Sequence, residues 1–242
     1  MLNEKITIYC AESEKLFADW KDTQGIVSPN TDTQTSINHK DSIFIRDGVV
    51  CPELWFAQDF RPLFLLKEAY GGDSDWDLAK NHLLLNKPID KIWERVSGWI
   101  KGMLNTTKTF LPEFIKDDTE TSRYNNEYLK KTAVINIKKS GGQSSSDYDE
   151  IGAYALFDKD RLKKQLELCD PTIIVCGYTS SYLETILDKN FRNPYNDNLF
   201  YHITLNGHDV IVIDFWHPAN HYPDIMNHYG FLSVYQKALN SN

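Results

Sequence analysis

Residues 62–72 read PLFLLKEAYGG and give the clearest indication of a central buried strand in this sequence. Its first five residues are apolar without alternation, which is typical of a strand buried on both faces of a parallel sheet. A charged segment with two glycines follows directly. Three more apolar runs have the same form: AVINI at 133–137, TIIVC at 172–176 and VIVID at 210–214. These runs predict a central, mainly parallel, four-stranded sheet.

Segments with helical periodicity lie between these runs. Their apolar residues recur every three or four positions, which indicates helices with one buried face. The segments cover residues 88–104, 156–166, 182–187 and 223–239. Strands that alternate with helices predict an α/β fold, a three-layer sandwich with helices on both faces of the sheet.

The chain shows no internal boundary after its first segment. Residues 1–42 are polar and irregular apart from a short helical pattern around Trp20, and we expect an N-terminal extension packed on the domain. No linker or repeat divides residues 43–242, which we interpret as a single α/β domain. Within it, DG at 47–48 and NG at 206–207 each lie between β-rich segments and predict tight hairpin turns.

Composition limits the classes of function. The 242 residues carry a net charge of −8, which argues against a protein that coats nucleic acid non-specifically, although phosphate contacts can be local. Six Trp, 13 Tyr and 12 Phe suit a dense core or a base-stacking surface. The sequence has no long apolar run and no signal-like start, so we expect no membrane span and a cytoplasmic location. Nothing indicates an obligatory protein partner, and we expect a monomer.

The four cysteines do not have the spacing of metal ligands. Cys169 and Cys176 lie seven positions apart, and Cys10 and Cys51 are distant from them. Zinc sites need Cys or His pairs at short spacing, and an iron–sulfur cluster needs several thiolates together. We therefore expect free, mostly buried thiols and neither a metal nor another cofactor.

Polar residues follow the buried strands at the edge where open parallel sheets bind ligands. Glu68 follows the first strand, Asn136 lies in the second and His217 follows the fourth. Each has an ordinary alternative: Glu68 as a surface acid, Asn136 as a residue that staples a loop, and His217 as the cap of a turn. An amide among isoleucines must be hydrogen-bonded, because its burial without a partner costs a few kcal/mol.

The order and spacing of these residues resemble the uracil-DNA glycosylase superfamily, over about residues 60–225. LKEAY at 66–70 is similar to the family's Gly-Gln-Asp-Pro-Tyr segment, VIN at 134–136 to its Asn-ended strand, and HPAN at 217–220 to its His-Pro-Ser-Pro segment. No motif is complete, because Glu replaces Asp, Ala replaces Pro and the second half of the His-Pro motif differs. The family's wedge leucine, four residues after the histidine, is replaced here by His221.

The resemblance implies a DNA glycosylase that flips a modified base out of the duplex, hydrolyses its N-glycosidic bond and leaves an abasic site. It implies that Glu68 stabilises the positive sugar and orients water, and that His217 donates to the departing base. The implied base-binding residues are Asn136, Tyr70, Lys67 and Phe215. The expected DNA contacts are Lys138, Lys139, Ser144, Asn220 and His221, although the lysines are equally typical of a solvated strand end.

The base itself stays open at this point. Uracil is one candidate, and a bulky modified cytosine of phage DNA, such as glucosylated hydroxymethylcytosine, is another that would suit phage defence. Tyr70 would crowd the 5-position of a base, whereas the glycines at 71–72 would open space beside it. Trp76 and Trp216 are further stacking candidates, each with a core alternative.

Three rival functions remain. A nucleoside or nucleotide hydrolase would use the same strand ends on small molecules, but the phosphate-binding motifs G-x-x-x-x-G-K-[ST] and G-x-G-x-x-G are missing. A catalytically silent DNA-binding relative would explain the imperfect first motif. A metal enzyme is the weakest alternative, because no cluster has ligand spacing.

Overall fold

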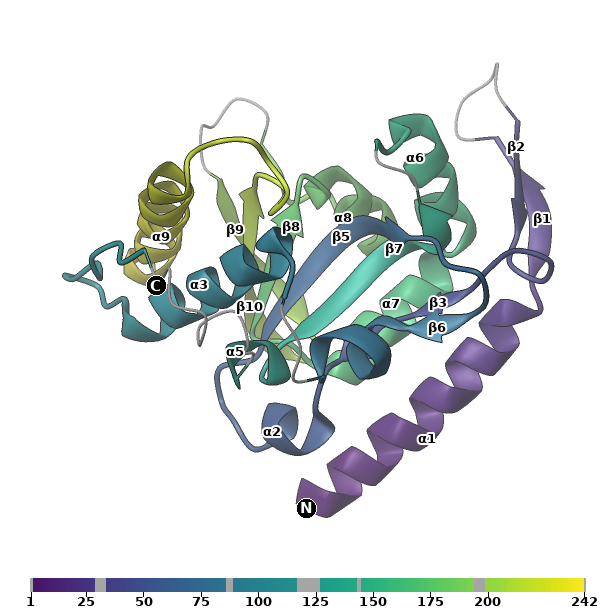
Figure 1. Cartoon of the computed structure of the whole chain (residues 1–242), viewed down its shortest axis with the longest axis horizontal. Helices are drawn as coiled ribbons and strands as arrows, with labels where there is room; N and C mark the ends of the chain where they lie inside the picture. Colours follow the sequence, from purple (N-terminus) through teal and green to yellow (C-terminus); the bar gives the residue numbers. More distant parts are fainter. Residues whose placement is uncertain are drawn as a thin grey trace.

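A mixed sheet of six strands forms the centre of the fold (Figure 1). The computed structural model describes residues 2–28, 34–85, 89–116, 127–142, 145–193 and 199–241. In spatial order the strands are β4 (Gly48–Val49), β7 (Ala133–Gly142), β5 (Pro62–Tyr70), β8 (Ile173–Gly177), β10 (His208–Phe215) and β9 (Phe200–Leu205). Neighbours from β7 to β10 pair in parallel, whereas β4 and β9 are antiparallel to their neighbours.

Two strand predictions need correction. The sheet has six described strands instead of four, because an antiparallel strand is added at each edge. The NG turn at 206–207 is confirmed and joins β9 to β10, with both residues at positive φ. The DG hairpin at 47–48 is wrong: β3 (Ile45–Arg46) pairs with β6 (Trp76–Asp77), while β4 pairs with β7. The chain passes from one sheet to the other at Asp47.

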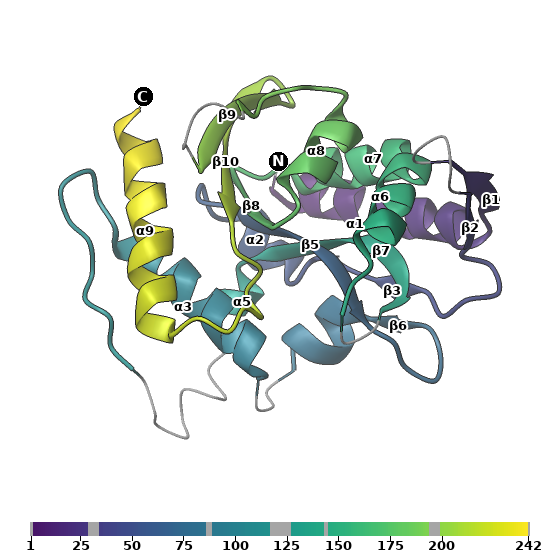
Figure 2. The ribbon, with the colours of Figure 1, turned by 90° about the horizontal axis from the view of Figure 1, so that it is seen from above.

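Helices cover both faces of the sheet (Figure 2). Alternate residues of β5 show the division, because Leu63 and Leu65 belong to one buried cluster and Phe64 and Leu66 to the other. The first face carries α1 (Leu2–Lys21), α6 (Tyr148–Phe157), α7 (Lys159–Cys169) and α8 (Ser180–Leu187), and the second carries α3 (Lys91–Asn105) and α9 (Asp224–Asn240). The helix predicted over 156–166 is divided between α6 and α7 at Asp158.

The N-terminal segment is more regular than the sequence indicates. Residues 2–21 form the continuous helix α1, whose Tyr9, Phe17 and Trp20 are buried in the core. It is followed by the antiparallel pair β1 (Gln24–Val27) and β2 (Thr35–Asn38). The shorter elements are α2 (Pro52–Phe56), a π-helix at Ala79–Leu83 and α5 (Glu127–Lys130). None of the helices in the described ranges combines the length and apolar character needed to cross a membrane.

Candidate functional site

His217 lies in the loop that follows β10, at the carboxyl ends of the parallel strands. Its Nδ1 accepts a hydrogen bond from the backbone N–H of Ala219 at 3.2 Å, which places the ring proton on Nε2. Burial, and then the nearby cation of Lys67, lowers the pKa of His217 to about 4. At neutral pH the imidazole is therefore uncharged, and its Nε2–H is not hydrogen-bonded to any described residue.

Gly177 allows the histidine loop to pack closely against the strand ends. A Cβ at this position would lie 2.7 Å from Cδ2 of Leu66 and 3.3 Å from Cδ2 of His217, so a side chain there would displace the loop. The next residue, Tyr178, has φ 64°, a left-handed conformation that is uncommon outside glycine. Its N–H donates to the carbonyl of Phe215, which ties the end of β8 to the end of β10.

Arg95 of α3 holds the loop from behind. Its Nη1 donates to the carbonyl oxygens of Pro218 at 2.5 Å and Asn220 at 2.8 Å, and its Nη2 to Asp224 Oδ1 at 2.5 Å. The planar, forked guanidinium suits several acceptors held in a fixed geometry. Arg95 is therefore a positioning residue for the His217 loop. The sequence around Arg95 predicts a helix and does not indicate this role.

Asn220 serves the loop rather than DNA. Its Nδ2 donates to the carbonyl of His217 at 2.9 Å and to Oδ1 of Asn227 at 2.7 Å, and its Oδ1 accepts from Asn227 Nδ2 at 3.0 Å. The predicted DNA contact through Asn220 is wrong, because both ends of its amide are used within the protein. His221 is exposed, and its contact with DNA stays a prediction.

Glu68 lies inside β5 and not in a loop after it. Its register partner on β7 is Lys138, and the two side chains form an ion pair of 3.2 Å. Lys138 also contacts Glu150 of α6 at 2.8 Å. Desolvation lowers the pKa of Lys138, but the two carboxylates outweigh it and the pKa is raised. The Glu68 side chain is only 5% exposed. The predicted phosphate contact of Lys138 is therefore wrong, because its ammonium is held by two acids.

Asn136 staples the edge of the sheet. Its backbone N–H donates to Oδ2 of Asp47 at 2.8 Å, and its Nδ2 reaches the same oxygen at 3.2 Å. The residue is 3% exposed and pairs with Leu66, whose buried side chain lies against Gly177. Strand β5, which carries Leu66, lies between the strand of Asn136 and the strand that ends at Gly177. The expectation that amide and imidazole meet in one cleft stays a prediction.

Lys139 is part of the core. It is fully buried, its Nζ bonds to Oδ1 of Asp47 at 2.6 Å, and it lies over the ring of Trp20 at 5.0 Å. Burial lowers its pKa even though Asp47 acts in the opposite direction. The predicted DNA contact of Lys139 is wrong, because its side chain points inward under α1. Ser144, the remaining predicted contact, lies outside the described residues.

An exposed group of aromatic side chains borders His217. Tyr148 of α6 and Tyr178 lie edge to face with centroids 6.2 Å apart, and Nζ of Lys67 lies 4.8 Å above the Tyr148 ring. Tyr178 is 60% exposed, and Tyr70 at the end of β5 is 68% exposed. We call Lys67, Tyr148 and Tyr178 the tyrosine platform. Neither tyrosine is predicted as a site residue from the sequence, although Tyr178 directly follows a strand that ends in glycine.

Phe215 does not face the site. It is buried and packs edge to face on Trp99 at 5.7 Å and Phe231 at 5.5 Å, so its predicted base-binding role is wrong. Trp216 lies against Tyr222 with ring centroids 4.3 Å apart. Trp76 is partly buried in the core around Phe215. For Phe215, the core alternative is the one observed.

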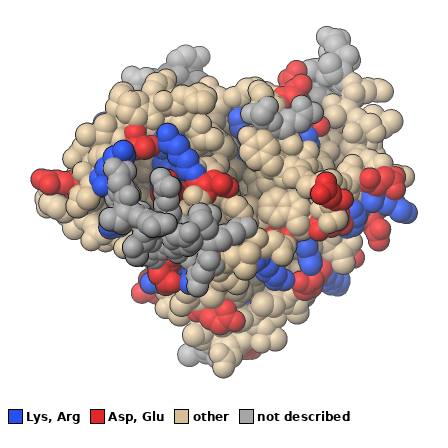
Figure 3. Space-filling model, in the orientation of Figure 1, with Lys and Arg blue, Asp and Glu red and all other residues tan. Residues whose placement is uncertain are grey.

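No known family model matches this chain, and no curated protein is significantly similar to it. In the ranges that the structure describes, no three His, Cys, Asp or Glu side chains are grouped to hold a metal ion. All four cysteines are free thiols, and Cys169 and Cys176 are the buried pair. Lys and Arg are interspersed with Asp and Glu on the face in Figure 3, where the described residues form no continuous basic surface.

Proposed function

We propose that this protein is a DNA glycosylase, which hydrolyses the N-glycosidic bond of a flipped-out modified base and leaves an abasic site. The observation that supports it most is the neutral imidazole of His217, whose Nε2–H is unused at the carboxyl edge of the sheet. Ligands of open parallel sheets bind at this edge. The motif resemblance to the uracil-DNA glycosylase superfamily, with four parallel strands as the common core, adds to this support.

The chemistry needs a donor where negative charge develops on the departing base. A neutral Nε2–H donates a hydrogen bond there, and it strengthens as the base oxygen becomes anionic. Lys67 lies close enough to His217 to lower its pKa, so its cation also acts on charge at this place. In this scheme His217 and Lys67 stabilise the leaving base, and Glu68 stabilises the positive charge on the sugar.

The surroundings of Tyr70 favour a large base. The side chain is 68% exposed instead of closing the site beside His217. Gly71 directly follows β5 and Gly141 lies near the end of β7, and a Cβ at Gly141 would lie 2.8 Å from the Gly71 Cα. These two glycines therefore mark a close approach of the two backbones and not an open space. Because an exposed Tyr70 leaves the 5-position of a base uncrowded, a cytosine with a bulky 5-substituent, such as the glucosylated form, is the preferred substrate over uracil.

A catalytically silent DNA-binding relative is the second candidate, and one observation favours it. The carboxylate of Glu68 is paired with Lys138 and only 5% exposed, so little of it reaches a substrate in this arrangement. Tyr148 and Tyr178 would still stack on an unpaired base, which every base permits through its flat face.

Base release separates these candidates. DNA containing uracil, hydroxymethylcytosine or glucosylated hydroxymethylcytosine is incubated with the protein, and free bases are identified by mass spectrometry. His217→Gln is expected to lower the rate about 100-fold, as the loss of one charge-stabilising donor does. His202→Gln on the edge strand β9 is the matched control and should retain the rate.

Two outcomes contradict the glycosylase. Undiminished release by His217→Gln removes the residue on which the proposal depends. DNA binding without release of any base supports the silent relative. Glu68→Gln, compared with the exposed Glu12→Gln of α1, tests the acid, and release from nucleosides but not DNA would favour the small-molecule hydrolase.

A further inference from the structure

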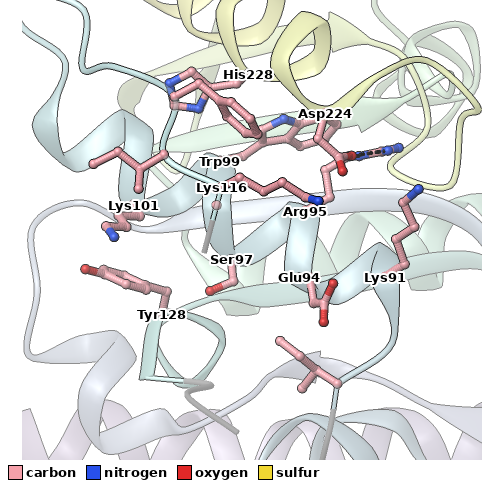
Figure 4. A pocket seen from close by; sticks show the side chains of 14 residues that line it. Lys91, Glu94, Arg95, Ser97, Trp99, Lys101, Lys116, Tyr128, Asp224 and His228 are labelled. Atoms are coloured by element: carbon pink, nitrogen blue, oxygen red, sulfur yellow. Dashed lines mark hydrogen bonds and ion pairs between the residues drawn. The ribbon is translucent and has the colours of Figure 1, made fainter. Parts of the chain in front are cut away.

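A separate cavity of about 240 Å³ lies on the other side of the His217 loop, over α3 (Figure 4). Its wall is built from α3, the segment 114–116, Tyr128 of α5 and the first turns of α9. In Figure 4, Tyr128 and Ser97 lie on one side of this space and His228 on the opposite side. Pockets for drug-sized ligands enclose ~300–1,000 Å³, so this cavity suits one small molecule.

The charge of the cavity wall is the reverse of the charge of the whole chain. Acids outnumber Lys and Arg by 34 to 26 in the sequence, whereas the wall has four Lys and Arg residues and only two acids. Arg95 is paired with Asp224. Lys91 and Lys101 are exposed, and neither ammonium has an ion pair within the described part of the chain. The cavity therefore presents cations that an anionic ligand could pair with.

Aromatic rings supply the remaining walls. Phe114 lies against His228 with ring centroids 5.4 Å apart, whereas Trp99, which also lines the cavity, is only 2% exposed and is stacked on Phe231. Tyr128 is partly exposed at the opposite side. Flat side chains bind a flat ring by stacking, and cations at the rim then place its charged group.

Gly98 keeps part of the cavity wall free of a side chain. It lies in the middle of α3, where glycine is a poor helix former, and it lines the cavity. A Cβ at Gly98 would meet no heavy atom within 4 Å, so no described neighbour requires a glycine there. Gly102, one turn later, differs: its Cβ would lie 2.8 Å from Cδ1 of Leu232 on α9. Packing explains Gly102, and an open cavity floor explains Gly98.

We infer that this cavity is a second binding site, for a small aromatic phosphate of mononucleotide size. Lys101 pairs with the phosphate, and the base lies between Phe114 and Tyr128. The ligand is either a free nucleotide or the phosphorylated end of a DNA strand, which present the same chemistry. This site is distinct from the proposed glycosylase site, because it uses none of the residues at the strand ends.

Calorimetric titration of the full chain tests the inference. The probes are thymidine 5′-monophosphate, thymidine, inorganic phosphate and a 5′-phosphorylated thymidine tetranucleotide. The monophosphate should bind more tightly than thymidine or phosphate. Gly98→Leu fills the cavity and should weaken its binding about tenfold, which is about 1.4 kcal/mol. Lys101→Glu should weaken it about threefold or more, whereas the exposed Lys164→Glu of α7 should not.

The outcomes divide clearly. Tighter binding of the tetranucleotide than of the monophosphate assigns the site to a strand end, and the opposite order assigns it to a free nucleotide. The inference is overturned if the monophosphate binds no better than its two halves, or if Gly98→Leu and Lys101→Glu both leave its affinity unchanged. Lys101→Glu alters an exposed side chain, so it remains informative if Gly98→Leu misfolds. Failure of base release leaves this binding test unaffected.

Discussion

Acidification provides the sharpest test of the environment assigned to His217. An unfolded chain protonates histidine with a pKa of about 6.5, whereas burial and Lys67 lower the pKa of His217 to about 4 in the folded protein. Between these values the unfolded chain binds a proton that the folded protein excludes. The free energy of unfolding therefore falls as the pH falls through this window. The difference between the two pKa values lowers the free energy of unfolding by about 3 kcal/mol once the pH is below both of them, and by about 2.5 kcal/mol at about pH 4.5.

Urea unfolding of the natural chain and of His217→Gln measures this quantity. Other titrating groups are common to both proteins, so the difference between their free energies of unfolding isolates the imidazole. That difference should be constant above about pH 7 and should change by about 2.5 kcal/mol by about pH 4.5. An NMR titration of the imidazole gives its pKa directly.

A flat difference between about pH 7 and 4.5, or an imidazole that titrates near 6.5, refutes the assigned environment. Lys67→Met adds an internal check. Because burial is the larger cause and Lys67 the smaller, this substitution should raise the pKa of His217 only part of the way. Full recovery of an ordinary pKa would show that the charge, and not burial, dominates.

Three further predictions concern the supports of the site. Arg95→Ala should lower the free energy of unfolding by about 2–4 kcal/mol in urea melts, because several carbonyl oxygens lose a charged donor. Equal melts for both proteins would contradict the clamp. Asp47→Ala should cost about 3–5 kcal/mol by leaving Lys139 buried and unpaired, and adding Lys139→Met should restore most of it. Failure of this rescue in the same melts would contradict the pairing. Gly98→Ala should stabilise the protein by up to about 1 kcal/mol, whereas Gly102→Ala should destabilise it by about 1–3 kcal/mol. Thermal melts that shift in the same direction for both glycines would contradict this contrast.

The central strands of the sheet and the hairpin to the edge strand β9 could be predicted from the sequence, whereas β4 at the other edge could not. The runs at 62–66, 133–137, 172–176 and 210–214 are apolar on both faces, and each became a strand. The extension of β7 to Gly142 was missed, because its polar end is buried by partners distant in sequence. The DG pair at 47–48 was misread for the same kind of reason. The Asp47 carboxylate binds groups on β7 and α7 instead of closing a turn.

The candidate site was predicted in part. The sequence correctly predicts His217 in a loop at the carboxyl ends of the parallel strands, whereas Glu68 lies within β5 and is paired with Lys138. The sequence does not predict where the side chains of Asn136 and Lys139 point, because both bind Asp47, about 90 positions earlier in the chain. A strand pattern gives the side on which a residue lies only while regular alternation lasts. Burial of a lysine by a distant acid leaves no local mark in the sequence.

The guanidinium of Arg95 takes part in two sites of the molecule. It lines the cavity over α3 and also grips the carbonyl oxygens behind His217. A ligand in the cavity that binds Arg95 or Asp224 changes the hydrogen bonds from Arg95 to the His217 loop. Movement of the His217 loop in turn changes the affinity of the cavity for its ligand. Thermodynamic linkage makes that influence equal in both directions. Binding in the cavity and reaction at His217 would then be coupled through the side chain of Arg95, without direct contact between the two sites.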